Sequence, residues 1–393
     1  MVDEVKMPYS RPMQSRVDSN SYKSTVILLI RGDANLGFGE APVFEEPRYF
    51  EEFTKQAIQA LVLMLNGIIK AVSYKSQGAY ELDILDVVEY LRRYVGNRSV
   101  KAAIEMAMVD LWARQQQKGG LPALVEYLSA SCNTVNFNSL GVNFNTNCLD
   151  YFEVLAQGTS LGLDSSSQAR IVALARLSAR GYRRVKIKVT NATSASEIRD
   201  LQHSLPGSDG LTPELSLDAN GSFFSADSVN RILLPEISYV EDPFAEHDLK
   251  SIGQLCEKTN ARIAFDQEVT SCNRLTDFIN YVKFDIATLK LSRLGGLKEL
   301  VNAISLCSHA AKSFYIGGMY DSPVLRRLNA LLITLFDPPE ISDLGPESDY
   351  FDLGVPPSVI RPSPNSLSIM GDWGITGAFI PANKHVTSSL RVI

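Results

Sequence analysis

Short apolar runs recur along the chain after residue 135, and each is followed by a stretch with helical periodicity. Seven of them are NFNSLG (136–141), RRVKIKV (183–189), ELSLDAN (214–220), SYVEDPF (238–244), RIAFDQE (262–268), FDIATLKL (284–291) and SFYIGGM (313–319). Alternating strand and helix patterns predict parallel βα units. Their spacing fits an α/β fold of the (β/α)8-type barrel better than an open doubly wound sheet. We expect the last strand between residues 338 and 360.

The N-terminal part of the chain has a different pattern. The stretch STVILLIRGDANLGFGEA (24–41) predicts two strands joined by a turn. The stretch SVKAAIEMAMVDLWARQQQKGG (99–120) predicts a helix that Ser99 caps and that ends at Gly119-Gly120. An α+β arrangement is therefore expected before the barrel.

The chain is long enough for more than one folded unit. Its 393 residues are 45% hydrophobic and 21% charged, which is the composition of an ordinary globular protein rather than of a disordered one. We predict an N-terminal α+β domain over 1–132, a (β/α) barrel over 133–365, and a C-terminal segment, 366–393, that returns to the N-terminal domain.

Charge and targeting patterns narrow the classes of partner. The 38 basic and 44 acidic residues give a net charge of −6 and form no basic run, which argues against nucleic acid. The chain starts without the pattern of a secretory signal, and its longest apolar run, ALVLMLNGII (60–69), is too short to span a bilayer. We expect a cytoplasmic protein with no membrane partner. The five cysteines are scattered without a CxxC pair, so neither disulfides nor a zinc site is predicted.

Five of the predicted strands end in a charged residue, namely Lys188, Asp218, Glu241, Asp266 and Lys290. One βα unit separates each of them from the next along the chain. The carboxyl ends of barrel strands surround one mouth, where barrel enzymes carry their active sites. These five side chains are therefore expected to converge.

Strand periodicity supports the same conclusion. Because side chains alternate between the two faces of a strand, Lys186 and Lys188 point inward while their apolar neighbours pack outward under the helices. The same alternation places Asn220 beside Asp218 on the inner face. A single charged strand end is more often a solvated residue or a helix cap. Three carboxylates and three lysines in one mouth carry a desolvation cost that favours a functional site.

The three carboxylates suit a hard metal ion. Magnesium takes oxygen ligands and keeps positions for water and substrate, so Asp218, Glu241 and Asp266 are the predicted ligands of Mg²⁺, with Mn²⁺ as an alternative. No histidine lies among them, which argues against zinc or iron. A divalent ion beside a substrate carboxylate stabilises the enolate that forms when an α-proton leaves.

Removal of that proton requires a base. Lysine acts as a base near neutral pH only when its ammonium form is disfavoured, and Lys186 supplies a like charge on the same strand face as Lys188. Lys188 is therefore the predicted base, and Lys186 is the residue predicted to lower its pKa.

The same residues resemble a known family. The stretches VKIKV (185–189), SLDANGSF (216–223), YVEDPF (239–244), IAFDQEV (263–269) and TLKLSRLGGL (288–297) have the order and spacing of the muconate-lactonising branch of the enolase superfamily. AAIEMAMVDLWA (102–113) is similar to the N-terminal capping domain of that branch. The resemblance implies that Lys188 is the acid/base lysine, that Lys290 is the lysine on the opposite face of the substrate, and that the three carboxylates bind the metal. Lysine bases that work with magnesium are known for this superfamily.

A further segment, GGMYDSPVLRRLN (317–329), resembles the one found in o-succinylbenzoate synthases and N-succinylamino acid racemases. The residues that the resemblance implies for binding a small carboxylate substrate are Lys186, Asn220, Gly317, Gly318 and Asp321. The departures from the family pattern are Gln267 in place of a glutamate, Asp321 in place of a longer glutamate, and Pro323 in place of a glycine.

The resemblance implies a carbon–oxygen lyase that converts 2-succinyl-6-hydroxy-2,4-cyclohexadiene-1-carboxylate to o-succinylbenzoate by syn dehydration, a step toward menaquinone. Racemisation of N-succinylamino acids, with both lysines as bases, is the first alternative. Dipeptide epimerase and muconate cycloisomerase are more distant alternatives, and an epimerase would be expected to carry an Asp-x-Asp pair at the eighth strand, for which Asp343 and Asp352 are the nearest candidates. A barrel that has lost catalysis and acts as a binding protein is the non-enzymatic alternative. The oligomeric state, including a homo-oligomer, stays open.

Overall fold

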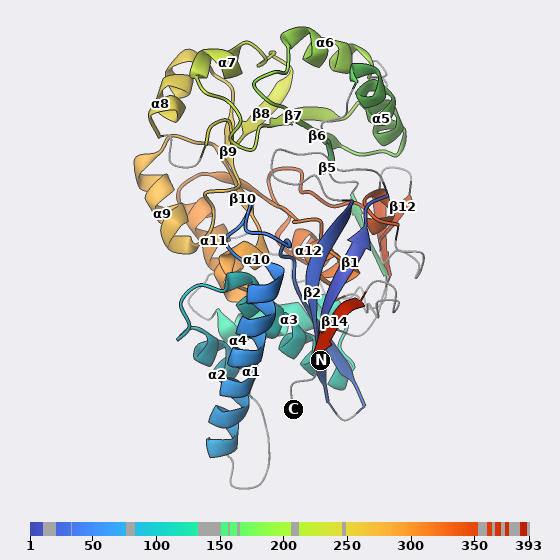
Figure 1. Cartoon of the computed structure of the whole chain (residues 1–393), viewed down its shortest axis with the longest axis vertical. Coiled ribbons are helices and arrows are strands. Elements are labelled where there is room, and N and C mark those ends of the chain that lie inside the picture. The colour runs from blue at the N-terminus through green and yellow to red at the C-terminus, as the bar shows by residue number, and fades with distance from the viewer. Residues whose placement is uncertain are drawn as a thin grey trace.

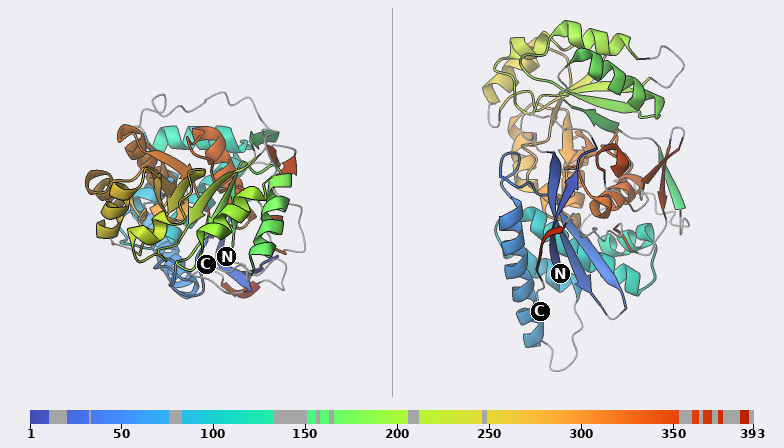
Figure 2. Two further views of the ribbon diagram at one scale, coloured as in Figure 1. Left: turned by 90° about the horizontal axis from the view of Figure 1, so that it is seen from above. Right: turned by 45° about the vertical axis from the view of Figure 1, so that its right-hand side comes forward.

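The computed structural model describes residues 1–10, 21–32, 34–75, 83–132, 151–155, 158–162, 166–205, 212–245, 249–352, 360–363, 366–370, 374–376 and 386–390. Within these ranges an antiparallel sheet with four helices lies below a curled parallel sheet that carries its helices on the outside (Figures 1 and 2). The predicted fold class, a (β/α)8-type barrel with an N-terminal α+β capping domain, is confirmed.

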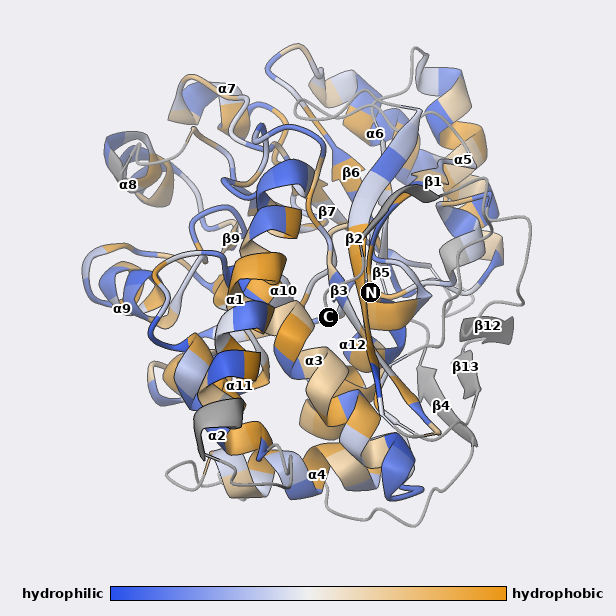
Figure 3. Cartoon of the chain, turned by 60° about the horizontal axis from the view of Figure 1, so that its bottom comes forward, coloured by the Kyte–Doolittle hydropathy of each residue, from blue (hydrophilic) through white to orange (hydrophobic). Residues whose placement is uncertain are grey.

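The capping domain is built on a four-stranded antiparallel sheet with the strand order β14-β1-β2-β3. Its strands are β1 (Val2–Pro8), β2 (Tyr22–Arg31), β3 (Leu36–Ala41) and β14 (Val386–Leu390), and its helices are α1 (Thr54–Lys75), α2 (Ile84–Leu91), α3 (Arg98–Gln115) and α4 (Gly120–Ser131). The predicted hairpin is confirmed, because β2 pairs with β3 from Val26↔Ala41 to Arg31↔Leu36. Helix α3 is largely apolar and buried because it packs against the sheet on one side and against the neighbouring helices on the others (Figure 3).

The start of α3 differs from the prediction. Asn97, with a φ of 50°, precedes the helix, and the Ser99 hydroxyl has no hydrogen-bond partner among the described residues. The carboxylate of Glu52 accepts the backbone N–H groups of Arg98 and Ser99 instead. The helix also ends at Gln115, several residues before the two predicted glycines. The predicted Ser99 cap is therefore wrong, because a carboxylate from a distant segment satisfies the first turn.

The barrel contains a seven-stranded parallel sheet whose strands follow chain order, β11-β10-β9-β8-β7-β6-β5. Its strands are β5 (Gly158–Leu161), β6 (Arg184–Lys188), β7 (Glu214–Asp218), β8 (Ile237–Glu241), β9 (Ile263–Phe265), β10 (Ile286–Leu289) and β11 (Ser313–Ile316). Its helices are α5 (Ser167–Ala179), α6 (Ala195–His203), α7 (Ala226–Asn230), α8 (Leu249–Lys258), α9 (Cys272–Tyr281), α10 (Leu291–Leu294), α11 (Leu297–His309) and α12 (Pro323–Phe336). Several of them begin after a serine whose hydroxyl accepts a first-turn N–H, which fixes the start of the helix. These serines are Ser166, Ser194, Ser225, Ser271 and Ser322.

A short segment closes the barrel between β11 and β5. Gly158 forms a parallel bridge with Asp343, the Asp343 N–H donates to the carbonyl of Ile316 at 3.0 Å, and the Gly158 N–H donates to the carbonyl of Ser342 at 2.7 Å. Residues 342–344 therefore take the place of the eighth strand, inside the interval predicted for it. The predicted first run, 136–141, lies outside the described residues, and β5 holds the first place in the sheet.

Two separate apolar clusters show which way the barrel residues face. Tyr239, Ala264, Ile286 and Tyr315 form a small cluster of their own. Their strand neighbours, such as Val240, belong to the main core, which also contains the buried residues of the outer helices. Since Tyr239 stands two residues before Glu241, and Ala264 two before Asp266, the charged strand ends share the inner face. The predicted inward direction of these charges is confirmed.

Two buried glutamates of the capping domain cap helices of the barrel. Glu40 on β3 accepts the N–H groups of Ser322 and Leu325 at the start of α12, at 3.0 and 3.2 Å. Glu105 on α3 accepts the N–H of Leu297 at the start of α11, at 2.8 Å. The first N–H groups of a helix have no partner inside it, and its N-terminus favours negative charge. Specific charged caps therefore join the two parts of the chain, in addition to apolar packing.

We predict that Glu105→Gln will weaken the dependence of stability on pH. Burial raises the pKa of Glu105 from 4.5 to about 7. The folded chain then binds this proton more tightly than the unfolded chain, so the contribution to the free energy of unfolding is full below pH 4.5 and is lost as the pH rises through about 7. The loss is on the order of 3 kcal/mol, and a glutamine cannot show it. Urea unfolding on either side of this pH window measures the difference.

The matched control for this experiment is Glu126→Gln. Glu126 lies on the exposed side of α4, where it forms an ion pair with Lys118. This control is expected to keep the pH dependence of the unaltered chain. A Glu105→Gln protein with the same pH dependence as the control would contradict the prediction.

Segments near the C-terminus contact both parts of the chain. Strand β14 pairs antiparallel with β1 in the capping sheet, and the N–H groups of Ile375 and Thr376 donate to Asp110 of α3. A separate three-stranded antiparallel sheet has the order β12 (Ile360–Ser363), β13 (Ser366–Met370) and β4 (Tyr151–Leu155), with β13 in the middle. The predicted domain boundaries stay predictions. Among the described helices, none has the length and apolar character needed to cross a membrane.

Candidate active site

A pocket lies at the carboxyl ends of the barrel strands and encloses about 770 Å³, including space open to solvent. The predicted site residues that line it are Lys186, Lys188, Asp218, Asp266, Lys290, Gly318 and Asp321. Asn220, Glu241 and Gly317 are not part of this lining, but each lies against a lysine that is. Phe44 and Tyr49 reach the pocket from the capping domain. Its lining combines apolar and charged side chains, as sites for small molecules do.

Lys188 ends β6 and is held by residues of the next strand. Its Nζ donates to Asp218 Oδ2 at 2.5 Å and to Asn220 Oδ1 at 2.8 Å. Lys188 stands opposite Asp218 in the register of β6 and β7, which places the two side chains together. The second oxygen of Asp218 accepts the backbone N–H of Asn220 at 3.1 Å. The expected convergence of the strand ends is therefore observed for Lys188 and Asp218.

Burial and the neighbouring charges act in opposite directions on the protonation of Lys188. Burial and the charge of Lys186 both favour the neutral amine. Asp218 and Tyr320 oppose them, and the net result is a raised pKa of Lys188. Lys186 lowers the pKa of Lys188, as predicted. The predicted net lowering of this pKa is nevertheless wrong when only the groups of the protein are considered.

Lys186 connects three groups in the interior of the barrel. Its Nζ donates to Glu241 Oε1 at 3.0 Å, to the Tyr315 hydroxyl at 3.1 Å and to Asp343 Oδ2 at 3.0 Å. Burial opposes the charged form, but the carboxylates of Asp343 and Glu241 raise the pKa of Lys186 well above its ordinary value. Lys186 is therefore a fixed cation that orients Glu241.

Asp343 lies on the segment that closes the barrel and was the nearest candidate for an Asp-x-Asp pair. Its carboxylate is paired with Lys186 and Arg184, and these cations lower its pKa to about 2 although burial opposes ionisation. The position two residues later is Gly345. Asp352 is exposed, and its N–H donates to the carbonyl of Pro8 in the capping sheet. The segment that closes the barrel therefore does not carry an Asp-x-Asp pair that starts at Asp343.

Lys290 lies across the mouth from Lys188, because β7, β8 and β9 separate their strands. Its Nζ donates to Asp266 Oδ2 at 2.6 Å and to the Tyr49 hydroxyl at 2.8 Å. Arg293 donates to the other oxygen of Asp266 at 3.0 Å. Burial opposes ionisation of Asp266, but the cations Lys290 and Arg293 lower its pKa. Asp266 is therefore held as a carboxylate facing the pocket.

The two glycines after β11 make room for their neighbours. A Cβ atom on Gly317 would lie 2.7 Å from Thr288 Cγ2 and 3.1 Å from Lys290 Cε. A Cβ atom on Gly318 would lie 2.6 Å from Asp321 Oδ2. Glycine at both positions therefore lets Lys290 and Asp321 occupy their places, while a direct role of either glycine in substrate binding stays a prediction.

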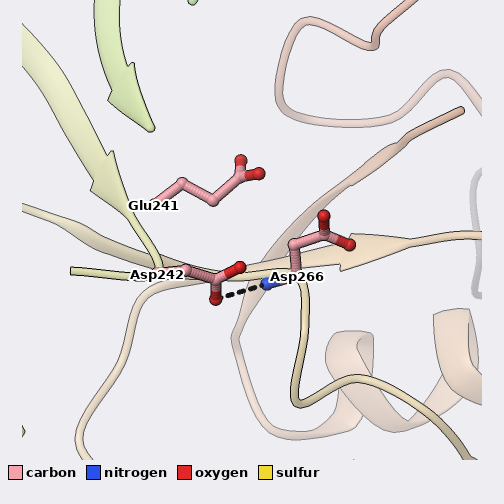
Figure 4. Close-up of side chains that lie close together, drawn as sticks. All are labelled: Glu241, Asp242 and Asp266. Carbon is pink, nitrogen blue, oxygen red and sulfur yellow. Dashed lines mark hydrogen bonds between the residues drawn. The ribbon is translucent and has the colours of Figure 1, made fainter. Parts of the chain in front are cut away.

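Three buried carboxylates lie close enough to hold one metal ion. Oxygens of Glu241, Asp242 and Asp266 lie within 4.8 Å of one another (Figure 4). Asp242 was not among the predicted residues, and its two oxygens accept the backbone N–H groups of Asp266 and Gln267, both at 3.0 Å. Asp242 therefore fixes the turn that carries Asp266. Asp218, the third predicted ligand, stands opposite Glu241 in the register of β7 and β8.

The electrostatics of this cluster favour a cation. Burial and the neighbouring carboxylates raise the pKa of Asp242 well above its ordinary value. Burial also raises the pKa of Glu241, although Lys186 opposes this. A divalent ion offsets such repulsion between carboxylates in a buried site, and an oxygen-only donor set suits Mg²⁺ or Mn²⁺. The acidic residues therefore fit a divalent metal ion.

Comparison with known proteins finds a matching family model and similar curated proteins. Residues 170–360 match the family model of enolase C-terminal domain-like proteins, and these residues include the lysines and carboxylates of the pocket. This part of the chain is similar to the C-terminal domain of enolase superfamily proteins. The o-succinylbenzoate synthase of Enterococcus faecalis is 24% identical over 335 residues, which are 83% of this chain and 80% of that protein. The N-succinylamino acid racemase of Thermus thermophilus is 25% identical over 339 residues, which are 84% of this chain and 80% of that protein.

A solved structure agrees on the fold of this superfamily. The crystal structure of a member of the enolase superfamily from Listeria innocua has a TM-score of 0.76 and 19% sequence identity, and the likeness covers 98% of this chain and 96% of that chain. The family model and the curated relatives together indicate that the chain is an enzyme. The predicted resemblance is confirmed at the level of the superfamily, and relatives with two different activities have similar identities to the chain.

Proposed function

We propose that this enzyme is an o-succinylbenzoate synthase, a lyase that removes water from 2-succinyl-6-hydroxy-2,4-cyclohexadiene-1-carboxylate in a step of menaquinone biosynthesis. The main support is the placement of Lys188 and Lys290 on opposite sides of one pocket, with the carboxylate-bearing strands β7, β8 and β9 between them. In this proposal a substrate carboxylate lies near the acidic cluster and its α-carbon lies between the two lysines.

In this proposal Asp218, Glu241 and Asp266 hold a magnesium ion. Bound Mg²⁺ supplies stabilisation of the negative charge that develops on the substrate carboxylate when the α-proton leaves. An Asp218 carboxylate that shares its charge with a cation binds the Lys188 proton less tightly, so Lys188 more readily takes the neutral form that a base requires. Asp242 holds the turn of Asp266, and Lys186 holds Glu241.

The two chemical steps use one proton. The Lys188 amine removes the α-proton, and the electron pair of the broken C–H bond moves into the enolate. The Lys188 ammonium then gives the same proton to the leaving hydroxyl group as the C–O bond breaks, so water departs from the face on which the proton was removed. Lys290 donates a hydrogen bond from the other face. No net proton is gained or lost, and the elimination is syn.

Racemisation of N-succinylamino acids is the second candidate. It needs one base on each face of the α-carbon, and the position of Lys290 across the mouth from Lys188 favours it. Epimerisation of dipeptides has less support, because Lys186 and Arg184 neutralise Asp343 and because Gly345 stands two residues later. Loss of catalysis has less support as well, because all five charged strand ends are retained.

The first experiment monitors the purified protein by ultraviolet absorbance with the cyclohexadiene substrate and Mg²⁺, and then with a chelator. Rapid conversion that stops on chelation is the expected result. Absence of conversion by a folded protein that binds Mg²⁺ would overturn the synthase proposal. The same protein incubated with an N-succinylamino acid, followed by polarimetry, tests the racemase candidate directly.

A further inference from the structure

A tyrosine of the capping domain touches both a lysine and a carboxylate at the centre of the pocket. The Tyr49 hydroxyl donates to Asp266 Oδ2 and accepts a hydrogen bond from Lys290 Nζ, with an oxygen-to-nitrogen distance of 2.8 Å. The same Asp266 oxygen accepts from Lys290 at 2.6 Å. The three groups therefore form a closed triangle of hydrogen bonds.

The ring of Tyr49 adds a second contact with these charges. Lys290 Nζ lies 5.1 Å from the ring centroid, and the Arg293 guanidinium carbon lies 5.5 Å from it. Cations at such distances are attracted by the electrons of the ring. Tyr49 thus covers the side of Lys290 that faces the capping domain.

The loop that carries Tyr49 is anchored at both ends. The Thr54 N–H and hydroxyl donate to the Phe44 carbonyl at 2.9 and 3.0 Å, which joins the two ends of the loop. Near its C-terminal end Glu51 pairs with Arg98 at 2.7 Å, and Glu52 accepts the first N–H groups of α3. Contacts within the capping domain therefore hold the loop that carries Tyr49.

The hydrogen bonds of Lys290 leave a defined direction for its remaining donor. A lysine ammonium has three N–H groups, and Tyr49 and Asp266 take two of them. Because both acceptors are held in place, the direction of the third N–H is set within the pocket that Lys290 lines. Without the tyrosine hydroxyl, the flexible side chain of Lys290 keeps only its contact with Asp266 and can rotate about it.

We infer that Tyr49 is a positioning residue for Lys290. It fixes the lysine on the face of the substrate opposite Lys188, so that the capping domain supplies part of the machinery of the second face. The inference rests on the proposed function in one respect, namely that Lys290 acts on the substrate. It does not depend on which of the two candidate reactions the enzyme catalyses.

The test compares the two faces of the α-carbon in the variant Tyr49→Phe, which keeps the ring and removes the hydroxyl. Each enantiomer of an N-succinylamino acid presents its α-proton to one lysine, and exchange of that proton for deuterium is followed by proton NMR. Lys188→Ala and Lys290→Ala first establish which enantiomer each lysine serves. Tyr49→Phe is expected to slow exchange of the enantiomer served by Lys290 by at least ~10-fold and to leave the other within ~2-fold, since hydrogen bonds to charged groups have effects of this size.

The matched control is Tyr350→Phe. Tyr350 also lines the pocket, but its hydroxyl contacts Thr159 at 2.9 Å rather than a lysine. The control is expected to change exchange of the two enantiomers by the same factor. An equal effect of Tyr49→Phe on both enantiomers, together with selective lysine variants, would overturn the positioning role and leave the proposed function intact. If the lysine variants themselves show no selectivity, the two lysines do not act on opposite faces and the positioning role fails, whereas the synthase proposal is still decided by conversion of the cyclohexadiene substrate.

A crystal structure of Tyr49→Phe provides a readout that is independent of turnover, and it decides the question if neither enantiomer exchanges. Lys290 Nζ is expected to be displaced or to occupy more than one rotamer, while the loop anchored by Glu52 keeps its place. A Lys290 side chain in its original single position would show that the hydroxyl does not position it.

Discussion

Lys188→Ala is expected to lower turnover by at least ~10³-fold while the chain stays folded, because the variant lacks the amine that removes the α-proton and returns it. The Nζ of Lys188 is held 2.5 Å from Asp218 at the edge of the pocket, where a substrate beside the acidic cluster would meet it. The rate of change in ultraviolet absorbance at saturating substrate measures turnover, and circular dichroism checks the fold.

Two further variants separate chemistry from structure. Lys188→Met keeps the length of the side chain without its charge, so it should be as inactive as the alanine variant even if the cavity left by alanine disturbs the strand. Lys258→Ala removes a half-exposed lysine that pairs with Asp227 on the surface and should retain full turnover. Turnover of Lys188→Met within ~10-fold of the unaltered enzyme would rule out Lys188 as the essential base.

Glu241→Gln is expected to weaken Mg²⁺ binding by at least ~100-fold, because it removes an anionic ligand from the centre of the acidic cluster. The change also leaves Lys186 without one of its two carboxylate partners, which adds an unfavourable cation beside the metal position. Isothermal titration calorimetry measures the affinity directly. In the unaltered enzyme, addition of Mg²⁺ should also raise the melting temperature, since an ion that binds only the folded chain stabilises it.

Glu268→Gln is the matched control for the metal site. Glu268 lies two residues after Asp266, but its carboxylate pairs with Arg274 at 2.6 Å and is outside the acidic cluster. Its Mg²⁺ affinity should stay within ~3-fold of the unaltered enzyme, since the cluster keeps all its anionic ligands. Equal affinities of the Glu241→Gln and Glu268→Gln proteins would contradict the assignment of Glu241 as a ligand.

The strand positions of the site residues were predictable because two periodicities determine them together. The βα repeat brings the carboxyl ends of successive strands to one mouth, and the alternation of faces decides which side chains enter it. Lys188, Asp218 and Lys290 obey both rules and line the pocket. The serine caps of the barrel helices are local features, because the cap and the capped N–H lie within one turn.

Contacts between distant segments could not be predicted in this way. Tyr49 lies on a loop without periodic pattern, 241 residues before its partner Lys290. The closing segment at 342–344 is too short to show the alternation of a strand. Ser99 had the local pattern of a cap, but Glu52 from another segment occupies that role. In each case tertiary packing chose the partner.

The pKa of Lys188 was mispredicted for a related reason. The alternation within β6 placed Lys186 beside Lys188, whereas Asp218 was expected at the same mouth only as a metal ligand. The opposite strand contributes Asp218 at hydrogen-bond distance, and its charge outweighs that of Lys186. Electrostatic predictions from one strand therefore omit the partners across the sheet. Asp242 was missed because strand parity places it away from Glu241, whereas its φ of 41° turns it back toward the cluster.

The glutamate caps between the two parts of the chain restrict how the parts can be exchanged with those of relatives. A chimaera that takes its capping domain from an enolase superfamily protein brings a different residue to the place of Glu40 or Glu105 unless the donor matches there. Helices α12 and α11 would then begin with buried N–H groups that lack an acceptor, and such groups are costly. Relatives that supply a domain for such a chimaera should therefore be selected first for compatible residues at the positions of Glu40 and Glu105. Only then should they be selected for the loops that surround the substrate.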